Sequence, residues 1–144
     1  MTSEERANRA AELALTKKAE NVITMELRGL TSTCDFFVIA TGTSDVQVKA
    51  IADAIGDGLT EVGEKPWHVE GYEGKRWILL DYVDVVVHAL KPGVRDYYQL
   101  ERLWADARTL VVDPDHLRRE DFRRRHPDLA TPGPAATGGL AGEA

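Results

Sequence analysis

The spacing of apolar residues divides the first half of the chain into a helix, two strands and a second helix. A helix is predicted over residues 3–19, with its first residue, a serine, as the N-cap. Polar and apolar side chains alternate over residues 21–28, which is typical of a half-buried strand. The nearly continuous apolar run over residues 34–41 predicts a central strand that is buried on both faces. Helical spacing over residues 45–62, with Ser44 as the N-cap, predicts the second helix.

The second half of the chain has the pattern of further strands and one long helix. Residues 66–72 are predicted to form a short strand near a sheet edge, because Pro66 has no N–H group for pairing. Residues 76–90 give the longest strand signal, which fits either two strands or one bent strand. A helix is predicted over residues 94–107 and a short strand over residues 109–112. This order predicts a single α/β domain whose mixed β-sheet is flanked by helices.

The pattern changes after residue 112. Asp113 and Pro114 have the chemistry of an N-cap followed by proline at the first helical position, which predicts a short basic helical extension over residues 113–129. Residues 130–144 are rich in proline, glycine and alanine and too poor in large apolar residues to pack, which predicts a disordered tail. The folded domain is therefore expected to span residues 1–112.

The charge of the folded part argues against free nucleic acid as a partner. Residues 1–113 carry 13 Lys and Arg against 19 Asp and Glu, so the whole formal net charge of -6 lies there. Phosphate binding depends on basic side chains, whereas a basic protein surface complements an acidic domain. The arginines within residues 118–125 are diluted by two acids, which favours a solvated face over a specific RNA contact.

Cysteine usage and hydropathy suit a cytoplasmic protein, which is the location we expect. Cys34 is the one cysteine, so no intramolecular disulfide can form, and we expect it to pack as a small apolar side chain. The charged N-terminus lacks the apolar run of a signal peptide, and no apolar segment is long enough to span a bilayer. We therefore expect no membrane association.

The turn Gly42-Thr43-Ser44 lies between a predicted strand and a predicted helix, where free N–H groups can cradle a phosphate. A tight turn with a serine cap accounts for the same residues without any ligand. The spacing of a P-loop and its lysine are absent. We favour the cap.

Asp81 and Asp84 are a candidate carboxylate pair for magnesium. Residues three apart on an extended strand point to opposite faces, so chelation of one ion would require a bulge. His88, at the end of an apolar run, is more typical of a hydrogen-bonded structural histidine than of a catalyst. The sequence therefore predicts no catalytic, metal-binding or cofactor-binding residue.

Four aromatic residues outside the apolar runs are candidates for an interface. Helical spacing places Tyr97 and Trp104 on one face of the predicted last helix, where they can serve as core. Tyr98 then points away from that face, and Trp77 opens the long strand signal. Exposed aromatic residues beside arginines are typical of interface hot spots.

Three segments taken together are specific: TCDFFVIATGTS at residues 33–44, WILLDYVDVVVH at residues 77–88 and RDYYQLERLW at residues 95–104. In order and spacing they closely resemble the ribosomal silencing factor family, also called the Iojap family, over residues 4–107. The family pattern often has glycine where this chain has Val83. The resemblance implies a mixed α/β sheet similar to that of nucleotidyltransferases, without their activity.

The resemblance also implies a partner and a mechanism. Members of the family bind the large-subunit ribosomal protein numbered fourteen at the intersubunit face, and the bound factor blocks joining of the small subunit. This represses translation when nutrients are limiting. By matching positions, the resemblance places seven residues on the binding face: Trp77, Leu79, Asp81, His88, Arg95, Tyr98 and Leu100.

Two other functions stay open at this point. The first is a nucleotidyltransferase-like enzyme that uses Gly42, Ser44, Asp81 and Asp84, which magnesium-dependent nucleotide binding would support. The second is a homodimeric module with no ribosomal role. Family members can self-associate, so a homodimer through the same face is a further expectation.

Overall fold

The computed structural model describes residues 1–115 and 124. Four helices and a six-stranded sheet account for most of these residues. The elements along the chain are α1 Ser3–Leu15, β1 Glu20–Glu26, β2 Phe36–Thr41, α2 Asp45–Thr60, β3 His68–Glu70, β4 Trp77–Asp81, β5 Val85–Leu90, α3 Pro92–Tyr98, α4 Leu100–Leu103 and β6 Arg108–Val111. The predicted extension and tail lie outside the described residues, apart from residues 113–115 and Arg124.

The sheet is mixed, as predicted, and its strands follow the order β3-β4-β5-β2-β1-β6. β2 and β5 are parallel, and the other four neighbouring pairs are antiparallel. β2 and β5 are nearly continuous apolar runs because both lie in the middle of the sheet and are buried on both faces over most of their length. The short strand β3, expected near an edge, does lie at an edge.

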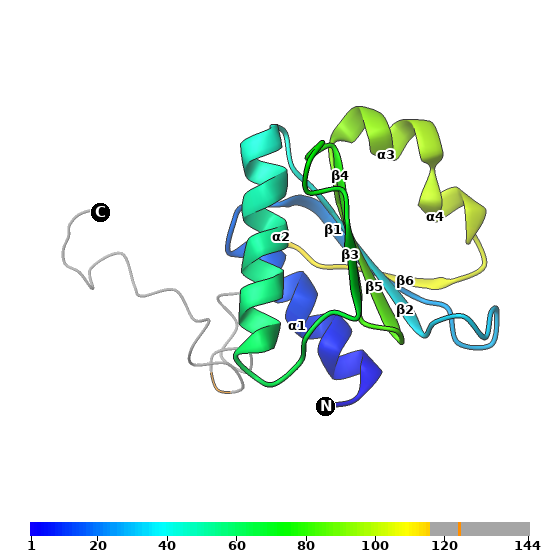
Figure 1. Ribbon diagram of the computed structural model, residues 1–144. Coiled ribbons are helices and arrows are strands. Elements are labelled where there is room, and N and C mark those ends of the chain that lie inside the picture. The colour runs from blue at the N-terminus through cyan, green and yellow to red at the C-terminus, as the bar shows by residue number, and fades with distance from the viewer. Residues whose placement is uncertain (116–123, 125–144) are drawn as a thin grey trace. The chain divides into compact units, whose positions relative to one another are not determined.

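Helices α1 and α2 cover one face of the sheet (Figure 1). On this face lie the buried side chains of Ile78 and Leu80 from β4 and of Val85 and Val87 from β5. The two helices approach each other closely at Gly58, where an added Cβ would lie 2.4 Å from a methyl group of Leu13. The two helices therefore pack closely against each other over this face.

The opposite face of the sheet carries α3 and α4, which cover only part of it (Figure 1). A second core cluster lies there, built from Ile23, Met25, Leu27, Cys34, Ile39, Leu90, Val94 and Ala107. Buried Cys34 belongs to it, as expected for a packed thiol, and burial raises the pKa of this thiol to about 11. Several apolar side chains packed against this cluster are only partly buried.

Two predicted boundaries are wrong in detail, and the choice left open for residues 76–90 is decided in favour of two strands. α1 is capped by Thr2 rather than by Ser3: Thr2 Oγ1 accepts from Glu5 N–H at 3.1 Å and Glu5 Oε1 accepts from Thr2 N–H at 2.8 Å. The signal over residues 76–90 resolves into two strands joined by a tight turn. The helix predicted over residues 94–107 begins at Pro92 and is interrupted at Gln99, which has a left-handed φ of 50°.

No helix in the part of the chain that the structure describes is long and apolar enough to cross a membrane.

Candidate functional site

The part of the sheet that α3 and α4 leave open is lined by apolar and aromatic side chains. Alternation along the paired strands brings Leu79, Val86 and Phe37 to the same face, and all three are half-buried. α3 and α4 add further aromatic and apolar groups beside them. We call the whole surface the apolar face; it consists of Phe37, Trp77, Leu79, Val86, Tyr98, Leu100 and Trp104.

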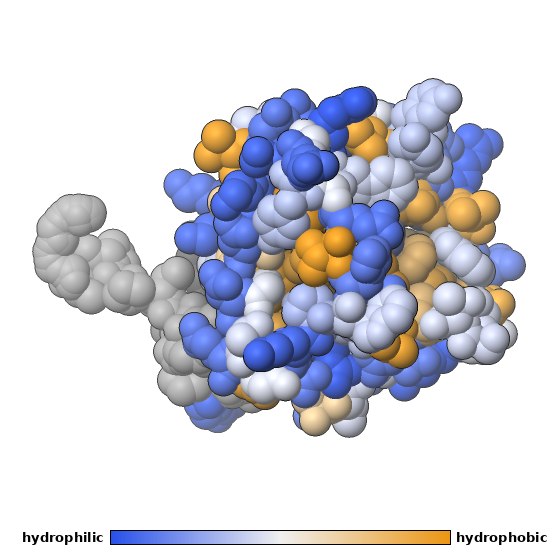
Figure 2. Space-filling view, viewed as in Figure 1, coloured by the Kyte–Doolittle hydropathy of each residue, from blue (hydrophilic) through white to orange (hydrophobic). Residues whose placement is uncertain are grey.

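The space-filling view shows apolar surface on the side of the molecule where α4 lies. There, orange patches interrupt the hydrophilic blue surface and lie among paler groups (Figure 2). Apolar surface that is rimmed by polar groups is typical of an interaction site.

Trp77 joins the sheet to α3. Its indole Nε1–H donates to Nδ1 of His88 at 3.1 Å, across the antiparallel pair of β4 and β5. Its ring lies against the ring of Tyr98, with centroids 4.8 Å apart. Trp77 is half-buried, whereas Tyr98 is exposed over 54% of its surface. Both rings are therefore held in place and still present area to a partner.

His88 lies beneath this surface and is 4% exposed. Burial lowers the pKa of its imidazole to about 4, so the ring is neutral at neutral pH. The ring packs edge-to-face on Phe37, with centroids 4.7 Å apart. The structure therefore places His88 as the support of Trp77 and Phe37 rather than as an exposed group.

Asp81 and Leu100 lie at the margins of the apolar face, and both are half-buried. The Oδ1 atom of Asp81 accepts from the backbone N–H of Val83 at 2.8 Å. This contact stabilises the turn between β4 and β5, in which Val83 has a φ of 76° and Asp84 N–H donates to the carbonyl of Tyr82 at 3.0 Å. A hydrogen bond that spans three residues at positive φ forms a strained γ-turn, and a β-branched residue is a poor fit to it.

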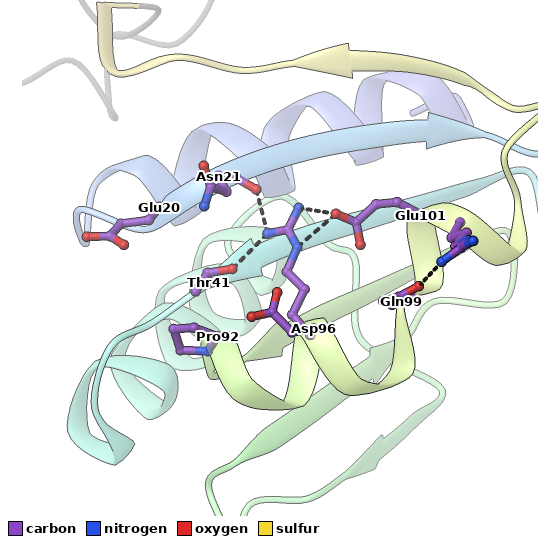
Figure 3. Close-up of a pocket in the computed structure, with 9 residues that line it drawn as sticks. Glu20, Asn21, Thr41, Pro92, Asp96, Gln99 and Glu101 are labelled. Atoms are coloured by element: carbon purple, nitrogen blue, oxygen red, sulfur yellow. Dashed lines mark hydrogen bonds and ion pairs between the residues drawn. The ribbon is translucent and has the colours of Figure 1, made fainter.

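Arg95 is buried, with 8% of its surface exposed, and it fastens α3 and α4 to the sheet. Its Nη1 atom donates to the carbonyl of Asn21 and to Oγ1 of Thr41, at 2.7 Å each. Its Nε and Nη2 atoms contact Oε2 of Glu101, both at 3.0 Å. Figure 3 shows these contacts converging from β1, β2 and α4.

The Arg95 network lines a cleft of about 340 Å³. Glu20, Asp96 and Arg102 add further charged groups to its wall. The donors of Arg95 are largely used within the protein, so the guanidinium group has a structural role here.

Three of the seven residues that the sequence places on the binding face come together closely in the structure: Trp77, His88 and Tyr98. Leu79 pairs directly with His88 across the strands. Arg95 and His88 are buried, so neither is an exposed contact. Tyr97, expected in the core, is 81% exposed, because the break at Gln99 changes which side of the helix faces the sheet.

Sequence analysis left Phe37 and Val86 out of the predicted binding face and gave Trp104 a core role. Phe37 lies in the run that was expected to be buried on both faces, and Val86 lies in the strand signal over residues 76–90, whereas both side chains are half-buried. The signal that would place Phe37 and Val86 on the apolar face is strand register: Phe37 pairs with Val86, and Val86 pairs with Asp81. Register depends on strand pairing and cannot be obtained from one segment alone.

The groups proposed for nucleotide chemistry are engaged within the protein. Ser44 accepts from Gln47 N–H at 3.1 Å, and the Gln47 side-chain oxygen accepts from Thr43 N–H at 2.7 Å. These contacts cap the start of α2, and an added Cβ at Gly42 would lie 2.9 Å from Val48 N. The turn therefore has the geometry of a self-capped helix start.

Asp84 points away from Asp81 and forms an ion pair. Its Oδ2 atom lies 2.6 Å from Nη1 of Arg6, and Arg6 Nε donates to Oε1 of Glu64 at 2.7 Å. This pairing ties α1 to the β4–β5 turn and to the chain after α2. Among the described residues, no group of three or more His, Cys, Asp or Glu side chains is arranged to hold a metal ion.

Comparisons with known proteins identify the family. The family model described as "Ribosomal silencing factor during starvation" matches residues 1–136. The chain belongs to the ribosomal silencing factor family. A protein named ribosomal silencing factor from Halalkalibacterium halodurans is 40% identical over 113 residues, which cover 78% of this chain and 97% of that protein. The Bacillus subtilis protein of the same name is 42% identical over 97 residues, 67% of this chain and 82% of that one.

Relatives of this silencing factor extend to organelles and to solved structures. A mitochondrial Iojap-related protein of Arabidopsis thaliana is 39% identical, over 61% of this chain and 50% of its own length. A crystal structure of a Chromobacterium violaceum protein superposes with a TM-score of 0.71 at 39% identity, covering 73% of this chain and 88% of that one. The similarity to the ribosomal silencing factors is therefore one of sequence and of fold.

Proposed function

We propose that this silencing factor docks on the large ribosomal subunit through its apolar face and thereby blocks joining of the small subunit. The partner on the ribosome is a ribosomal protein at the intersubunit face, which the family resemblance identifies as large-subunit protein fourteen. Repression of translation under nutrient limitation follows from this steric block. The observation that carries the proposal is the ring contact between half-buried Trp77 and exposed Tyr98 within the open apolar face.

The contact residues fall into two groups on this proposal. Trp77, Leu79, Tyr98 and Leu100 make the apolar contact, and Asp81 lies at the rim, where a charge fixes orientation. His88 and Arg95 contribute from below, because their buried side chains hold Trp77 and the segment from α3 to α4.

Charge supports a protein partner over bare RNA. The domain up to residue 113 carries the formal net charge of -6, so RNA phosphate repels it and a basic protein attracts it. This silencing factor needs no catalytic group for a steric mechanism, and we propose that it is not an enzyme. Its bacterial relatives and their ribosomal names favour the cytoplasm as its location.

The test is paired binding and stability measurements on Trp77→Ala and Tyr98→Ala. Truncation of an interface anchor costs about 2 kcal/mol or more, so each variant should bind purified large subunits about thirtyfold more weakly in sedimentation assays. Tyr97→Ala is the matched control, since Tyr97 is the adjacent tyrosine, is 81% exposed and lies outside the apolar face.

Thermal melts decide whether a loss of binding is due to the interface. Tyr98 is 54% exposed, so Tyr98→Ala should melt close to the parent protein. Undiminished binding by folded Trp77→Ala and Tyr98→Ala would show that another face docks. A second copy of the chain is a competitor for the same face, and we expect a homodimer to be lost when large subunits are added.

A further inference from the structure

We infer that two copies of this silencing factor associate weakly through their β6 strands, which pair antiparallel about a two-fold axis at Leu110 and join two sheets into one. This contact is distinct from the homodimer expected through the apolar face. β6 lies four strand positions from β4, or about 19 Å at the usual spacing of strands. The Trp77 end of the apolar face therefore lies outside the contact.

The two edges of the sheet differ in how well they are protected. A proline and charged side chains are among the devices that prevent edge strands from pairing with another chain, and β3 follows Pro66 and carries His68 and Glu70. β6 has the sequence RTLV without a proline, and all of its residues are exposed, Leu110 over 58% and Val111 over 68% of their surface. Among the residues that the structure describes, no strand pairs with the outer side of β6. β6 is therefore the open edge.

The pairing of β6 with β1 shows which backbone groups of β6 point outward. The N–H group of Val112 donates to the carbonyl of Val22 at 2.9 Å, so Val112 points toward β1. Consecutive residues of a strand direct their N–H and C=O groups to opposite sides, and Leu110 therefore points toward β1 as well. Thr109 and Val111 point outward, and each offers one N–H and one C=O group to another strand.

These outward groups are complementary to a second copy of the same strand. When Leu110 lies opposite Leu110 of the second copy, Thr109 of each copy lies opposite Val111 of the other. Each such pair exchanges both of its N–H···O=C hydrogen bonds, so all the outward groups of the two strands are paired. Arg108 then lies opposite Val112 of the second copy, so no like charges meet directly across the strands.

Leu110 supplies the apolar part of the contact. Its cross-strand neighbour is Thr24, so its side chain lies on the side of the sheet that α1 covers. There it borders a groove of about 280 Å³, whose lining includes Asn8 of α1 and Phe36 of β2. The two Leu110 residues form a pair of the type without direct hydrogen bonds, in which Cα atoms are about 4.5 Å apart and side chains are closest. This pairing buries a leucine side chain that is 58% exposed in one copy.

The charged side chains beside β6 are paired with one another. Glu26 contacts Arg28 at 2.8 Å and Arg108 at 2.9 Å, and Glu4 lies 3.8 Å from Arg28. Two acids and two arginines cancel, so this edge suits a copy of itself better than a highly charged strand. The formal net charge of -6 on each copy still repels at longer range. The dimer should therefore strengthen as salt rises from about 50 to about 500 mM, and a dimer that weakens would contradict the inference.

Disulfide trapping tests the register of the two strands. Leu110→Cys places two thiols directly opposite each other across the axis, within reach of a disulfide bond. Val111→Cys, the matched control, places them on the diagonal, with Cα atoms about 7–8 Å apart, at or beyond the limit for this bond. Both positions are exposed, and Cys34 is buried in both variants. At about 0.5 mM protein in a glutathione buffer, Leu110→Cys should form covalent dimer at least about tenfold faster than Val111→Cys. Equal rates, or no covalent dimer from either variant, would overturn the inference.

Sedimentation equilibrium tests the hydrogen bonds without a cross-link. Tyr98→Ala serves as the background, so that association through the apolar face contributes little. We expect this variant to dimerise with a dissociation constant of about 0.1 mM, because the contact is smaller than a standard interface. Adding Val111→Pro removes an outward N–H group and leaves the pairing with β1 intact, and it should weaken the dimer at least about tenfold. A monomeric background at about 1 mM, or a dimer that Val111→Pro leaves unchanged, would show that β6 does not pair.

Discussion

Replacing Arg95 by methionine tests whether this residue supports the apolar face from within. Methionine keeps an apolar side chain of similar length and removes every hydrogen bond of the guanidinium group. Those bonds join α3 to Asn21 of β1, to Thr41 of β2 and to Glu101 of α4. The buried hydroxyl of Thr41, a residue that is 2% exposed, would lose its charged partner.

The contacts of Arg95 contribute different amounts to the free energy of unfolding because they differ in exposure to solvent. Hydrogen bonds from a charged donor contribute about 1.5–3 kcal/mol each, which applies to the 2.7 Å bonds to Asn21 and Thr41. The side chain of Glu101 is 40% exposed, so its ion pair with Arg95 contributes at most about 1 kcal/mol after solvent screening. Arg95→Met should therefore lower the free energy of unfolding by about 4 kcal/mol, equivalent to a melting temperature roughly 15 °C lower.

Urea unfolding of the parent protein, Arg95→Met and Glu101→Gln measures this difference. Glu101→Gln is the matched control, because it removes the ion pair and leaves the bonds to Asn21 and Thr41. We expect it to cost at most about 1 kcal/mol. A cost for Arg95→Met that is no larger than that of Glu101→Gln would refute the argument, since the buried bonds would then contribute nothing.

Three further predictions follow from single groups. Val83→Gly should raise the free energy of unfolding by about 1 kcal/mol, because glycine adopts the positive φ of 76° without strain, while Val83→Ala, which keeps a Cβ, should gain less in the same urea assay. Burial lowers the pKa of His88 from 6.5 to about 4, so the unfolded state binds more protons than the folded state between these pH values. The free energy of unfolding should therefore decrease by up to about 3 kcal/mol as the pH falls through this window. His88→Asn should flatten this part of the stability–pH curve. Calorimetry with ATP and magnesium should show no micromolar binding, because Asp81 and Asp84 already contact Val83 and Arg6; saturable heat that Asp81→Ala abolishes would restore the enzyme alternative.

The elements that sequence reasoning predicted well are those with a strong apolar pattern. The helix at residues 45–60 combines regular apolar spacing with the Ser44 cap, and the central strand at residues 36–41 is a nearly continuous apolar run. The helix is buried on one side and the strand on both faces over most of its length, as these patterns imply. The mixed sheet followed from their order along the chain.

The segment from α3 to α4 was harder to predict because its helical spacing is not the spacing of a single helix. Leu100, Leu103 and Trp104 continue the period of Tyr97, but the left-handed Gln99 rotates everything that follows. Position 99 is a glutamine, so neither a glycine nor a proline marks this break in the sequence. Tyr97 is exposed as a result, and the neighbouring Tyr98 packs on Trp77.

The structure brings together several residues of the predicted binding face, but it places them at depths that the sequence did not predict. Family resemblance placed Trp77, Tyr98, His88 and Arg95 together, and the structure joins the first three through a hydrogen bond and a ring contact. Nothing in a linear pattern distinguishes a residue that touches a partner from one that holds such a residue in place. That distinction depends on burial, which here separates exposed Tyr98 from buried His88 and Arg95.

On the proposed function, the apolar face is rigid before its partner arrives. Trp77 is held by the ring of His88. Tyr98 and Leu100 flank Gln99, the C-cap of α3, and Arg95 fastens this segment. Side chains that are already fixed lose little conformational entropy on docking, so more of the apolar contact appears as affinity. The buried polar groups thus act on the interface without touching it. Substitutions at Arg95 should therefore lower affinity according to how far they release the segment from α3 to α4. The charge that they remove should matter less.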